Sequence, residues 1–308
     1  MESLQEKIAD LKRQKRAIIL AHYYTNAEVQ QVADFVGDSL ALSQRAADVD
    51  ADIILFAGVR FMAETAKVLS PDKKVLLPVV EAGCSLADSC DAEELQRVKQ
   101  ANPDHLVVAY VNTSVEVKAL TDICCTSSNA LEIIESLPKE QKVLFVPDRN
   151  LGSYINRCTG RDMKLWDGCC LVHEEFSVEK IEALRREHPE AKVLVHPECK
   201  PEVVALADYA GSTAGILNYC AREDVREVIV VTESGILFEM QERYPEKKFY
   251  LVEPERGEQR CVSCRDMKKV TLENIYQTLL DESPEVVIEE GVRKAAEGAI
   301  VRMLECGK

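Results

Sequence analysis

The chain has 308 residues, 46% of them hydrophobic and 30% charged, and its formal net charge is -15. This composition is typical of an ordinary globular protein, and so acidic a chain without a basic run repels the phosphates of nucleic acid, which excludes DNA and RNA as main partners. The first 15 residues contain no apolar leader, and no stretch approaches the about 20 apolar residues of a membrane span. We therefore expect a cytoplasmic protein that binds no membrane.

Short apolar runs alternate with amphipathic stretches along most of the chain. Runs of four to six residues rich in Val, Ile and Leu predict strands at 17–20, 53–57, 75–79, 106–111, 143–146, 193–196, 227–231 and 249–252. A helical period between them predicts helices at 29–36, 40–47, 61–69, 129–137, 178–186 and 235–244. This alternation predicts an α/β fold with short parallel sheets covered by helices. From residue 271 the pattern predicts helices only, with a long one at 287–304, and we expect this segment to pack on the first α/β unit.

Polar residues recur at nearly equal intervals along the chain. Three end predicted strands and are 88 and 86 residues apart: His22, Tyr110 and His196. Three hydroxyls in the turns behind them have the same two separations: Ser39, Ser127 and Thr213. Two sets of positions that share one period indicate three copies of one supersecondary unit. We expect three αβα units related by a pseudo-threefold axis, formed by residues 1–85 with 262–308, 86–171 and 172–261, with one active site where they meet.

Twelve cysteines in a reducing compartment favour buried thiols with a metal or redox site over a set of disulfides. Three lie near the ends of the three units, separated by 86 and 94 residues: Cys84, Cys170 and Cys264. Pseudo-threefold symmetry would bring these thiols together at the axis. Three thiolates can hold a 4Fe-4S cluster that leaves one iron open to substrate as a Lewis acid. Cys261 and Cys264 also form a lone CxxC, which fits a redox pair.

The polar segments taken together resemble the quinolinate synthase family of de novo NAD biosynthesis. In the family's order, the segments that carry the resemblance are Ala21-His22-Tyr23-Tyr24, Gly37-Asp38-Ser39-Leu40, Gly58-Val59-Arg60-Phe61-Met62-Ala63-Glu64, Ala82-Gly83-Cys84-Ser85, Tyr110-Val111-Asn112, Cys125-Thr126-Ser127-Ser128-Asn129-Ala130, Val146-Pro147-Asp148, His196-Pro197-Glu198-Cys199 and Gly211-Ser212-Thr213. The resemblance implies three α/β units around a pseudo-threefold axis and a 4Fe-4S cluster on Cys84, Cys170 and Cys264. It also implies a transferase reaction that joins iminoaspartate to dihydroxyacetone phosphate, with loss of phosphate and two waters, to give quinolinate.

The same resemblance implies which residues meet the substrates. The positions that match substrate contacts are His22, Ser39, Tyr110, Val111, Asn112, Ser127, His196, Pro197, Glu198 and Thr213. Tyr24 and Glu198 are the acid and base candidates, because a phenol and a carboxyl can move protons once the site has tuned their pKa values. Each of the three hydroxyls is expected to open a helix, where free N–H groups favour an anion, although each alone could also be a plain N-cap.

Two departures from the family pattern concern the cysteines. The last ligand commonly lies in a Cys-Pro-x-Met context, and here the chain reads Cys264-Arg265-Asp266-Met267, where Met267 keeps the register and favours Cys264 over Cys261. Cys169 and Cys170 are adjacent, and the spacing from Trp166 and Gly168 selects Cys170.

Two other functions fit the same residues. One is an iron-sulfur hydro-lyase acting on another hydroxy acid, and the other is a non-enzymatic redox sensor that uses the cluster or the Cys261/Cys264 pair. If the chain is a quinolinate synthase, an L-aspartate oxidase is the expected functional partner, because an imine substrate is unstable in water.

Overall fold

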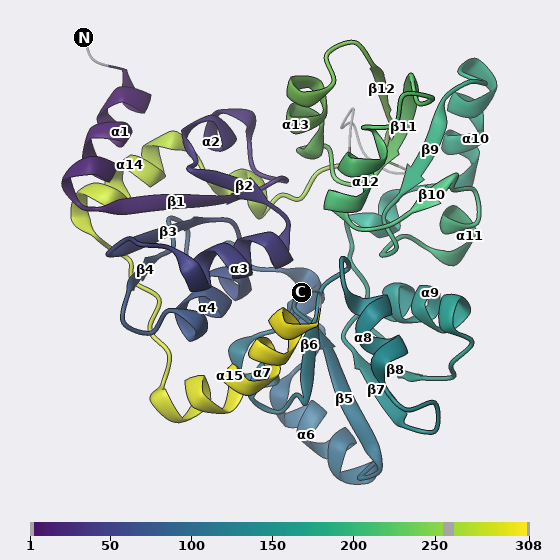
Figure 1. Ribbon diagram of the computed structural model, residues 1–308, viewed down its shortest axis with the longest axis horizontal. Helices are drawn as coiled ribbons and strands as arrows, with labels where there is room; N and C mark the ends of the chain where they lie inside the picture. The colour runs from purple at the N-terminus through teal and green to yellow at the C-terminus, as the bar shows by residue number, and fades with distance from the viewer. Residues whose placement is uncertain (1–2, 255–261, 307–308) are drawn as a thin grey trace.

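The computed structural model describes residues 3–254 and 262–306, which form three separate sheets of four parallel strands around a common centre (Figure 1). The first sheet has the order β2-β1-β3-β4, the second β6-β5-β7-β8 and the third β10-β9-β11-β12. The strands are β1 (Ala17–His22), β2 (Phe35–Gly37), β3 (Ile53–Ala57), β4 (Lys74–Leu76), β5 (His105–Tyr110), β6 (Ile123–Cys125), β7 (Lys142–Val146), β8 (Lys164–Leu165), β9 (Lys192–Val195), β10 (Tyr209–Ala210), β11 (Glu227–Val231) and β12 (Lys248–Leu251). The same strand order in each sheet confirms the prediction of an α/β fold built from three αβα units.

The repeat extends to individual hydrogen bonds. In each unit an aspartate just before the second strand accepts a hydrogen bond from a backbone N–H of the first strand. The three bonds are Ile19 N to Asp34 Oδ2 (2.7 Å), Val107 N to Asp122 Oδ2 (2.8 Å) and Val193 N to Asp208 Oδ2 (2.8 Å). These aspartates have the same separations of 88 and 86 residues that the sequence shows for the polar strand ends. The period therefore marks equivalent structural positions.

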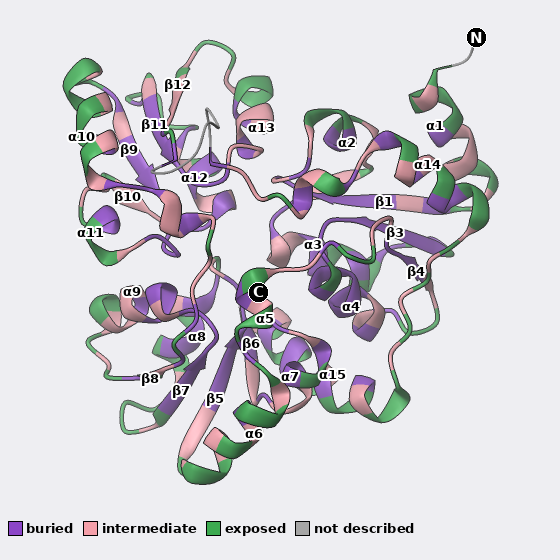
Figure 2. Ribbon diagram, turned by 180° about the vertical axis from the view of Figure 1, so that it is seen from behind, coloured by how far each residue is buried: buried purple, intermediate pink, exposed green. Residues whose placement is uncertain are grey.

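Helices cover both faces of each sheet. Along β3, Ile53 and Leu55 contact the side formed by α1 (Leu4–Gln14) and α14 (Leu272–Asp281). Ile54 and Phe56 contact the opposite side, formed by α3 (Ser39–Asp48) and α4 (Arg60–Leu69). Successive side chains of a strand point to opposite faces, so a strand between two helix layers must be apolar on both. Figure 2 shows the resulting buried strands between partly exposed helices. The helices before the C-terminal pair are α1 (Leu4–Gln14), α2 (Ala27–Val32), α3 (Ser39–Asp48), α4 (Arg60–Leu69), α5 (Ser85–Asp88), α6 (Ala92–Ala101), α7 (Val115–Ala119), α8 (Ala130–Ser136), α9 (Arg149–Thr159), α10 (Val178–Glu187), α11 (Pro201–Val204), α12 (Thr213–Tyr219) and α13 (Ile236–Arg243).

The shortest strands differ from the prediction. All eight predicted strands are present, two of them (53–57 and 227–231) with the predicted ends and six with shifted ends. However, β2, β6, β8 and β10 were not predicted, and the helix expected at 29–36 ends at Val32. Each of these strands has only two or three residues, too few to display an alternating pattern. They form because a longer neighbour supplies the hydrogen-bonding partners, as β1 does in the pairing of Leu20 with Phe35.

The C-terminal helices join two units. Helix α14 (Leu272–Asp281) packs on α1 and β3 of the first unit, as expected. Helix α15 (Glu290–Glu305) instead lies mainly against α7 and β6 of the second unit, with a further contact to α4 of the first (Figure 1). The expectation that the whole segment packs on the first unit is therefore wrong for α15. The proposed unit boundaries at residues 85, 171 and 261 stay a prediction. None of the described helices is both long and apolar enough to cross a membrane.

Candidate active site

The carboxyl ends of the strands from all three units surround one pocket, whose empty volume is about 650 Å³. Most residues that the sequence analysis selected line it: His22, Tyr24, Ser39, Cys84, Tyr110, Asn112, Ser127, Cys170, His196, Glu198, Thr213 and Cys264. Two predicted substrate contacts, Val111 and Pro197, are buried but are not among the lining residues. Open parallel sheets place ligands at the carboxyl ends of their strands, and three such ends converge here.

The hydroxyls reach the pocket in two different ways. Ser39 and Thr213 are the first residues of α3 and α12, and the caps of those helices are their neighbours, Asp38 and Ser212. The side chain of Asp38 accepts from Ala41 N (2.9 Å), and that of Ser212 accepts from Gly215 N (3.1 Å). The alternative that Ser39 and Thr213 are plain N-caps is therefore wrong.

Ser127 does not open a helix. It lies in the loop before α8, which begins at Ala130 and has Asn129 as its N-cap residue. The Oδ1 atom of Asn129 accepts from Thr126 N at 2.8 Å, which holds this loop against the helix start. The expectation for Ser127 is therefore wrong about the helix, although the residue does line the pocket.

Glu198 lies at the centre of a buried polar cluster. Its Oε2 is 2.8 Å from Nδ1 of His173, and its Oε1 accepts a hydrogen bond from the phenol of Tyr110. Burial by itself would raise the pKa of Glu198, but the facing imidazole of His173 and the Tyr110 hydrogen bond hold it well below its usual range. Glu198 is therefore a carboxylate at neutral pH.

The sequence analysis missed His173. The residue is buried in the short 3-10 helix η1 (His173–Glu175), where its Nε2 is 3.1 Å from Thr232 Oγ1 and its Nδ1 is 3.3 Å from Cys170 Sγ. His173 is not one of the polar residues at strand ends, because η1 follows no strand directly. The sequence signal that could have found His173 is its position three residues after Cys170, a candidate metal ligand. Among the described residues, the ligand atoms of Cys170, His173 and Glu198 lie within 4.8 Å of one another.

Two further imidazoles are neutral donors. Burial lowers the pKa of His22 and of His196 to about 3, so both rings are uncharged at neutral pH. The Nδ1 atom of His22 accepts from Tyr24 N (3.2 Å), and that of His196 accepts from Glu198 N (3.4 Å). A neutral ring that accepts at Nδ1 carries its proton on Nε2. Each ring can therefore donate a hydrogen bond from Nε2 to an oxygen of a ligand.

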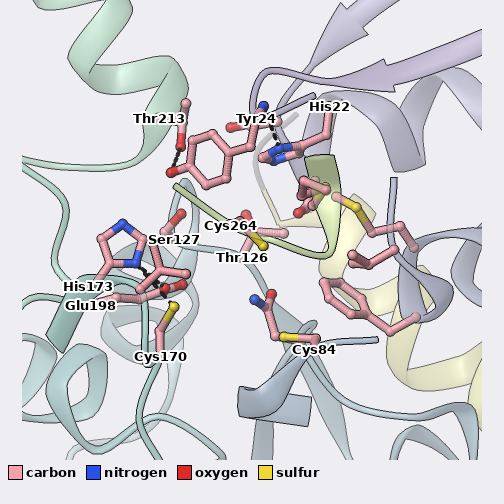
Figure 3. Close-up of a pocket in the computed structure, with 18 of the residues that line it drawn as sticks. His22, Tyr24, Cys84, Thr126, Ser127, Cys170, His173, Glu198, Thr213 and Cys264 are labelled. Atoms are coloured by element: carbon pink, nitrogen blue, oxygen red, sulfur yellow. Dashed lines mark hydrogen bonds and ion pairs between the residues drawn. The ribbon is translucent and has the colours of Figure 1, made fainter. Parts of the chain in front are cut away.

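Tyr24 reaches from the first unit to the third. Its phenol oxygen is 2.8 Å from Oγ1 of both Thr213 and Thr232, as Figure 3 shows for Thr213. Burial raises the pKa of this phenol well above 10, which outweighs the two hydrogen bonds. Tyr24 therefore stays protonated at neutral pH, and its pKa, like that of Glu198, lies farther from neutrality than the free value.

Three half-buried thiols line the pocket, each from a different loop (Figure 3). Cys84 immediately precedes α5, Cys170 precedes η1, and Cys264 precedes the 3-10 helix η2 (Met267–Lys269). Burial raises the pKa of all three, that of Cys84 to about 12, so each would be neutral without a cation. A metal deprotonates the thiols that bind it, and soft thiolates favour iron-sulfur clusters or zinc. This donor set fits a thiolate-bound metal.

The competing cysteines differ from these three. Cys169, the neighbour of Cys170, is half-buried but is not among the residues that line the pocket. Cys261 lies outside the described residues. The selection of Cys170 and Cys264 as ligands stays a prediction that agrees with their position.

Comparison with known proteins decides the family. The family model described as "Quinolinate synthetase A protein" matches residues 6–305. The chain belongs to the quinolinate synthase family. A relative from Trichodesmium erythraeum named quinolinate synthase is 50% identical over 304 residues, which are 99% of this chain and 94% of the relative. The quinolinate synthase of Microcystis aeruginosa is 51% identical over 304 residues, covering 99% of this chain and 95% of that protein. The resemblance drawn from the motifs is confirmed, and the chain is an enzyme of this type.

Proposed function

We propose that this protein condenses iminoaspartate with dihydroxyacetone phosphate to quinolinate, with release of phosphate and water. The observation that carries the proposal is a pocket to which all three units contribute side chains and which contains hydroxyls, imidazoles and thiols. Both substrates are anionic, and the pocket offers uncharged donors rather than lysines or arginines among its lining residues. Such donors can bind carboxylate and phosphate oxygens inside a protein whose net charge is -15.

Binding would use the donors that face the pocket. The Nε2–H groups of His22 and His196 and the hydroxyls of Ser39 and Ser127 can each hold one substrate oxygen. Asn112 adds an amide, whose buried Oδ1 has no hydrogen-bond partner among the described residues. A buried carbonyl without a partner costs free energy, so this atom is suited to accept from a substrate amine or hydroxyl.

Proton transfer would use two residues of opposite character. Glu198 is the base, because it is ionised and its position next to His173 lets that imidazole share a proton it takes. Tyr24 is the acid, because its phenol is protonated and its two threonine partners hold it in place. A condensation followed by dehydration needs both functions, one to remove a proton from carbon and one to protonate a leaving hydroxyl.

Cys84, Cys170 and Cys264 would hold a 4Fe-4S cluster. When bound, such a cluster supplies an open iron that acts as a Lewis acid toward a substrate hydroxyl or carboxylate. Cys170, His173 and Glu198 form a second donor set, whose thiol, imidazole and carboxylate would suit a single zinc ion. Because Cys170 belongs to both sets, one metal excludes the other, and metal analysis separates them.

The test begins with protein purified without oxygen. We expect about four iron and about four sulfide per chain, lost in Cys84→Ala and retained in Cys158→Ala, whose thiol is exposed and outside the pocket. The loaded protein should then form quinolinate from the two substrates. Zinc, or no metal after reconstitution, would contradict the cluster. A loaded protein that makes no quinolinate but dehydrates another hydroxy acid would favour the hydro-lyase alternative.

Substrate supply is part of the proposal. Iminoaspartate hydrolyses in water, so we propose functional coupling to an L-aspartate oxidase that forms it. A matched assay would compare quinolinate yield with the oxidase in the same solution and with the oxidase behind a dialysis membrane. Equal yields would contradict the need for coupling.

A further inference from the structure

A fully buried carboxylate lies outside the pocket but accepts a hydrogen bond from a residue that lines it. Glu233 follows β11 and is not among the residues that line the pocket. Its Oε1 accepts from the backbone N–H of Cys264 (3.0 Å) and lies 3.1 Å from Nζ of Lys268. Its Oε2 accepts from Gly235 N at 2.6 Å. A buried carboxylate is costly unless it is paired and hydrogen-bonded, and this one has three donors.

Lys268 connects the carboxylate of Glu233 to the backbone of Tyr24 in the first unit. Its Nζ donates to the backbone carbonyl of Tyr24 at 2.6 Å, in addition to its ion pair with Glu233. Its backbone N–H donates to the carbonyl of Cys264 at 3.1 Å. One ammonium group therefore joins the candidate acid, the buried carboxylate and the segment that carries the third thiol.

The third unit approaches the backbone of Tyr24 unusually closely at Gly235. A Cβ atom at position 235 would lie 2.7 Å from Cα of Tyr24 and 2.8 Å from Nζ of Lys268, closer than real Cβ contacts. Gln30 adds a second bridge, because its Nε2 donates both to Tyr23 O (2.9 Å) and to Gly235 O (3.1 Å). Glycine is thus required for the carbonyl of Tyr24 to reach Lys268.

Tyr24 is held at both ends, at its phenol by the third unit and at its carbonyl by the C-terminal segment. Its phenol bonds to Thr232, the residue next to Glu233, and its carbonyl bonds to Lys268. The N–H of Cys264 donates to Glu233, and the carbonyl of Cys264 accepts from the backbone N–H of Lys268. The phenol and the thiol therefore share one support.

We propose that Glu233 and Lys268 are positioning residues that fix the phenol of Tyr24 relative to the thiol of Cys264. The proposal rests on the proposed function, in which Tyr24 donates a proton to the substrate. Neither residue lines the pocket, so both act through Tyr24 and Cys264. A displacement of about 1 Å in a catalytic group can lower a rate by about 100-fold, which gives this pair a measurable effect on turnover.

The first test compares two adjacent lysines. Lys268→Met removes the bridge, whereas Lys269→Met is the matched control, because Lys269 contacts Asp266 and the carbonyl of Glu81 instead. For Lys268→Met we expect kcat for quinolinate to fall about 10-fold to 100-fold, with KM changed less than about threefold and iron content unchanged. Lys268→Arg should restore part of kcat. Equal kcat values for Lys268→Met and Lys269→Met would overturn the proposal.

The second test does not depend on activity. Hydrogen exchange is measured on the full chain for the peptides that contain Tyr24 and Cys264. Glu233→Gln should speed exchange about tenfold or more in both peptides, and Glu227→Gln, whose carboxylate pairs with Lys248 on the sheet, should change neither. Unchanged exchange in Glu233→Gln would contradict the shared support. If Glu233→Gln speeds exchange but the wild-type protein forms no quinolinate, the proposed function is refuted and the positioning role stays intact.

Discussion

At the scale of single residues, burial sorts the polar groups of the pocket into donors and acceptors. His22, His196 and Tyr24 are all kept in their uncharged forms, because removing a charge from water costs more than their hydrogen bonds return. Glu198 alone of these four is ionised, because His173 lies 2.8 Å away. A pocket that combines the carboxylate of Glu198 with these neutral donors is suited to substrates that lose and gain protons.

The role of Glu198 leads to the first prediction. Glu198→Gln keeps the shape and the hydrogen bond from Tyr110 but removes the proton acceptor, so we expect kcat to fall about 100-fold or more. Iron and sulfide content should not change, because Glu198 is not one of the three thiols proposed to hold the cluster. Glu174→Gln is the control, since Glu174 lies near the cluster of polar groups but does not line the pocket. An active Glu198→Gln enzyme would remove Glu198 from the mechanism.

At the scale of elements, the residues at which helices begin and end fix the conformation of the neighbouring loops. Helix α9 follows Asp148, whose side chain accepts from Leu151 N, and it ends at Gly160 with a left-handed φ of 69°. Nothing lies within 4 Å of a Cβ atom built at this glycine, so only its backbone conformation requires glycine.

We therefore predict the effect of changing this helix end. Gly160→Ala should lower the free energy of unfolding by about 1 kcal/mol, because an L side chain is disfavoured at positive φ. Gly160→Asn should cost less, because asparagine tolerates this conformation. Chemical denaturation of both variants checks the order, and equal stability of the alanine variant and the wild type would contradict it.

The ion pairs of Glu282, at the C-terminal end of α14, predict that the stability of the fold depends on pH. Hydrogen bonds from Lys15 and Lys74 lower the pKa of Glu282 to about 2. The pKa of Glu282 in the folded state lies below its unfolded value of about 4.3. The stabilisation from its ion pairs is therefore complete above about pH 5 and is lost as the pH falls toward 2. The difference in denaturation midpoint between wild type and Glu282→Gln should therefore shrink over that interval. A difference that stays constant with pH would contradict the ion-pair explanation.

At the scale of the whole molecule, α15 ties the second unit to the first. Near the C-terminal end of α15, the buried Nδ2 atom of Asn129 donates to the carbonyls of Met303 (3.0 Å) and Cys306 (3.3 Å). The Oδ1 atom of the same side chain holds the loop that carries Thr126 and Ser127. Docking of the last helix and the shape of one pocket wall thus depend on one amide.

Removal of that amide gives the fourth prediction. Asn129→Ala leaves buried carbonyls and a buried N–H without partners, so we expect a loss of about 2 kcal/mol in the free energy of unfolding. Hydrogen exchange should also rise in the last turns of α15. Asn218→Ala, at an exposed position on α12, is the control and should change neither quantity. Wild-type stability in Asn129→Ala would show that apolar packing alone docks the helix.

Much of the architecture could be predicted because it is encoded locally. Apolar runs such as 53–57 mark strands that are buried on both faces, and the separations of 88 and 86 residues reveal the three units. The short strand Phe35–Gly37 could not be predicted, because its hydrogen-bonding partners belong to β1 rather than to its own segment. The same holds for α15, whose amphipathic pattern does not say which unit it covers.

The sequence by itself determined the family, the three-unit α/β fold and most residues that line the pocket, because strand ends and repeats are properties of the linear chain. Only the tertiary structure decided that His173 faces Glu198, that Ser39 and Thr213 are not the caps of their helices, and that Glu233 and Lys268 join Tyr24 to Cys264. These contacts join segments up to 244 residues apart. They arise from packing between units, which no local pattern of residues records.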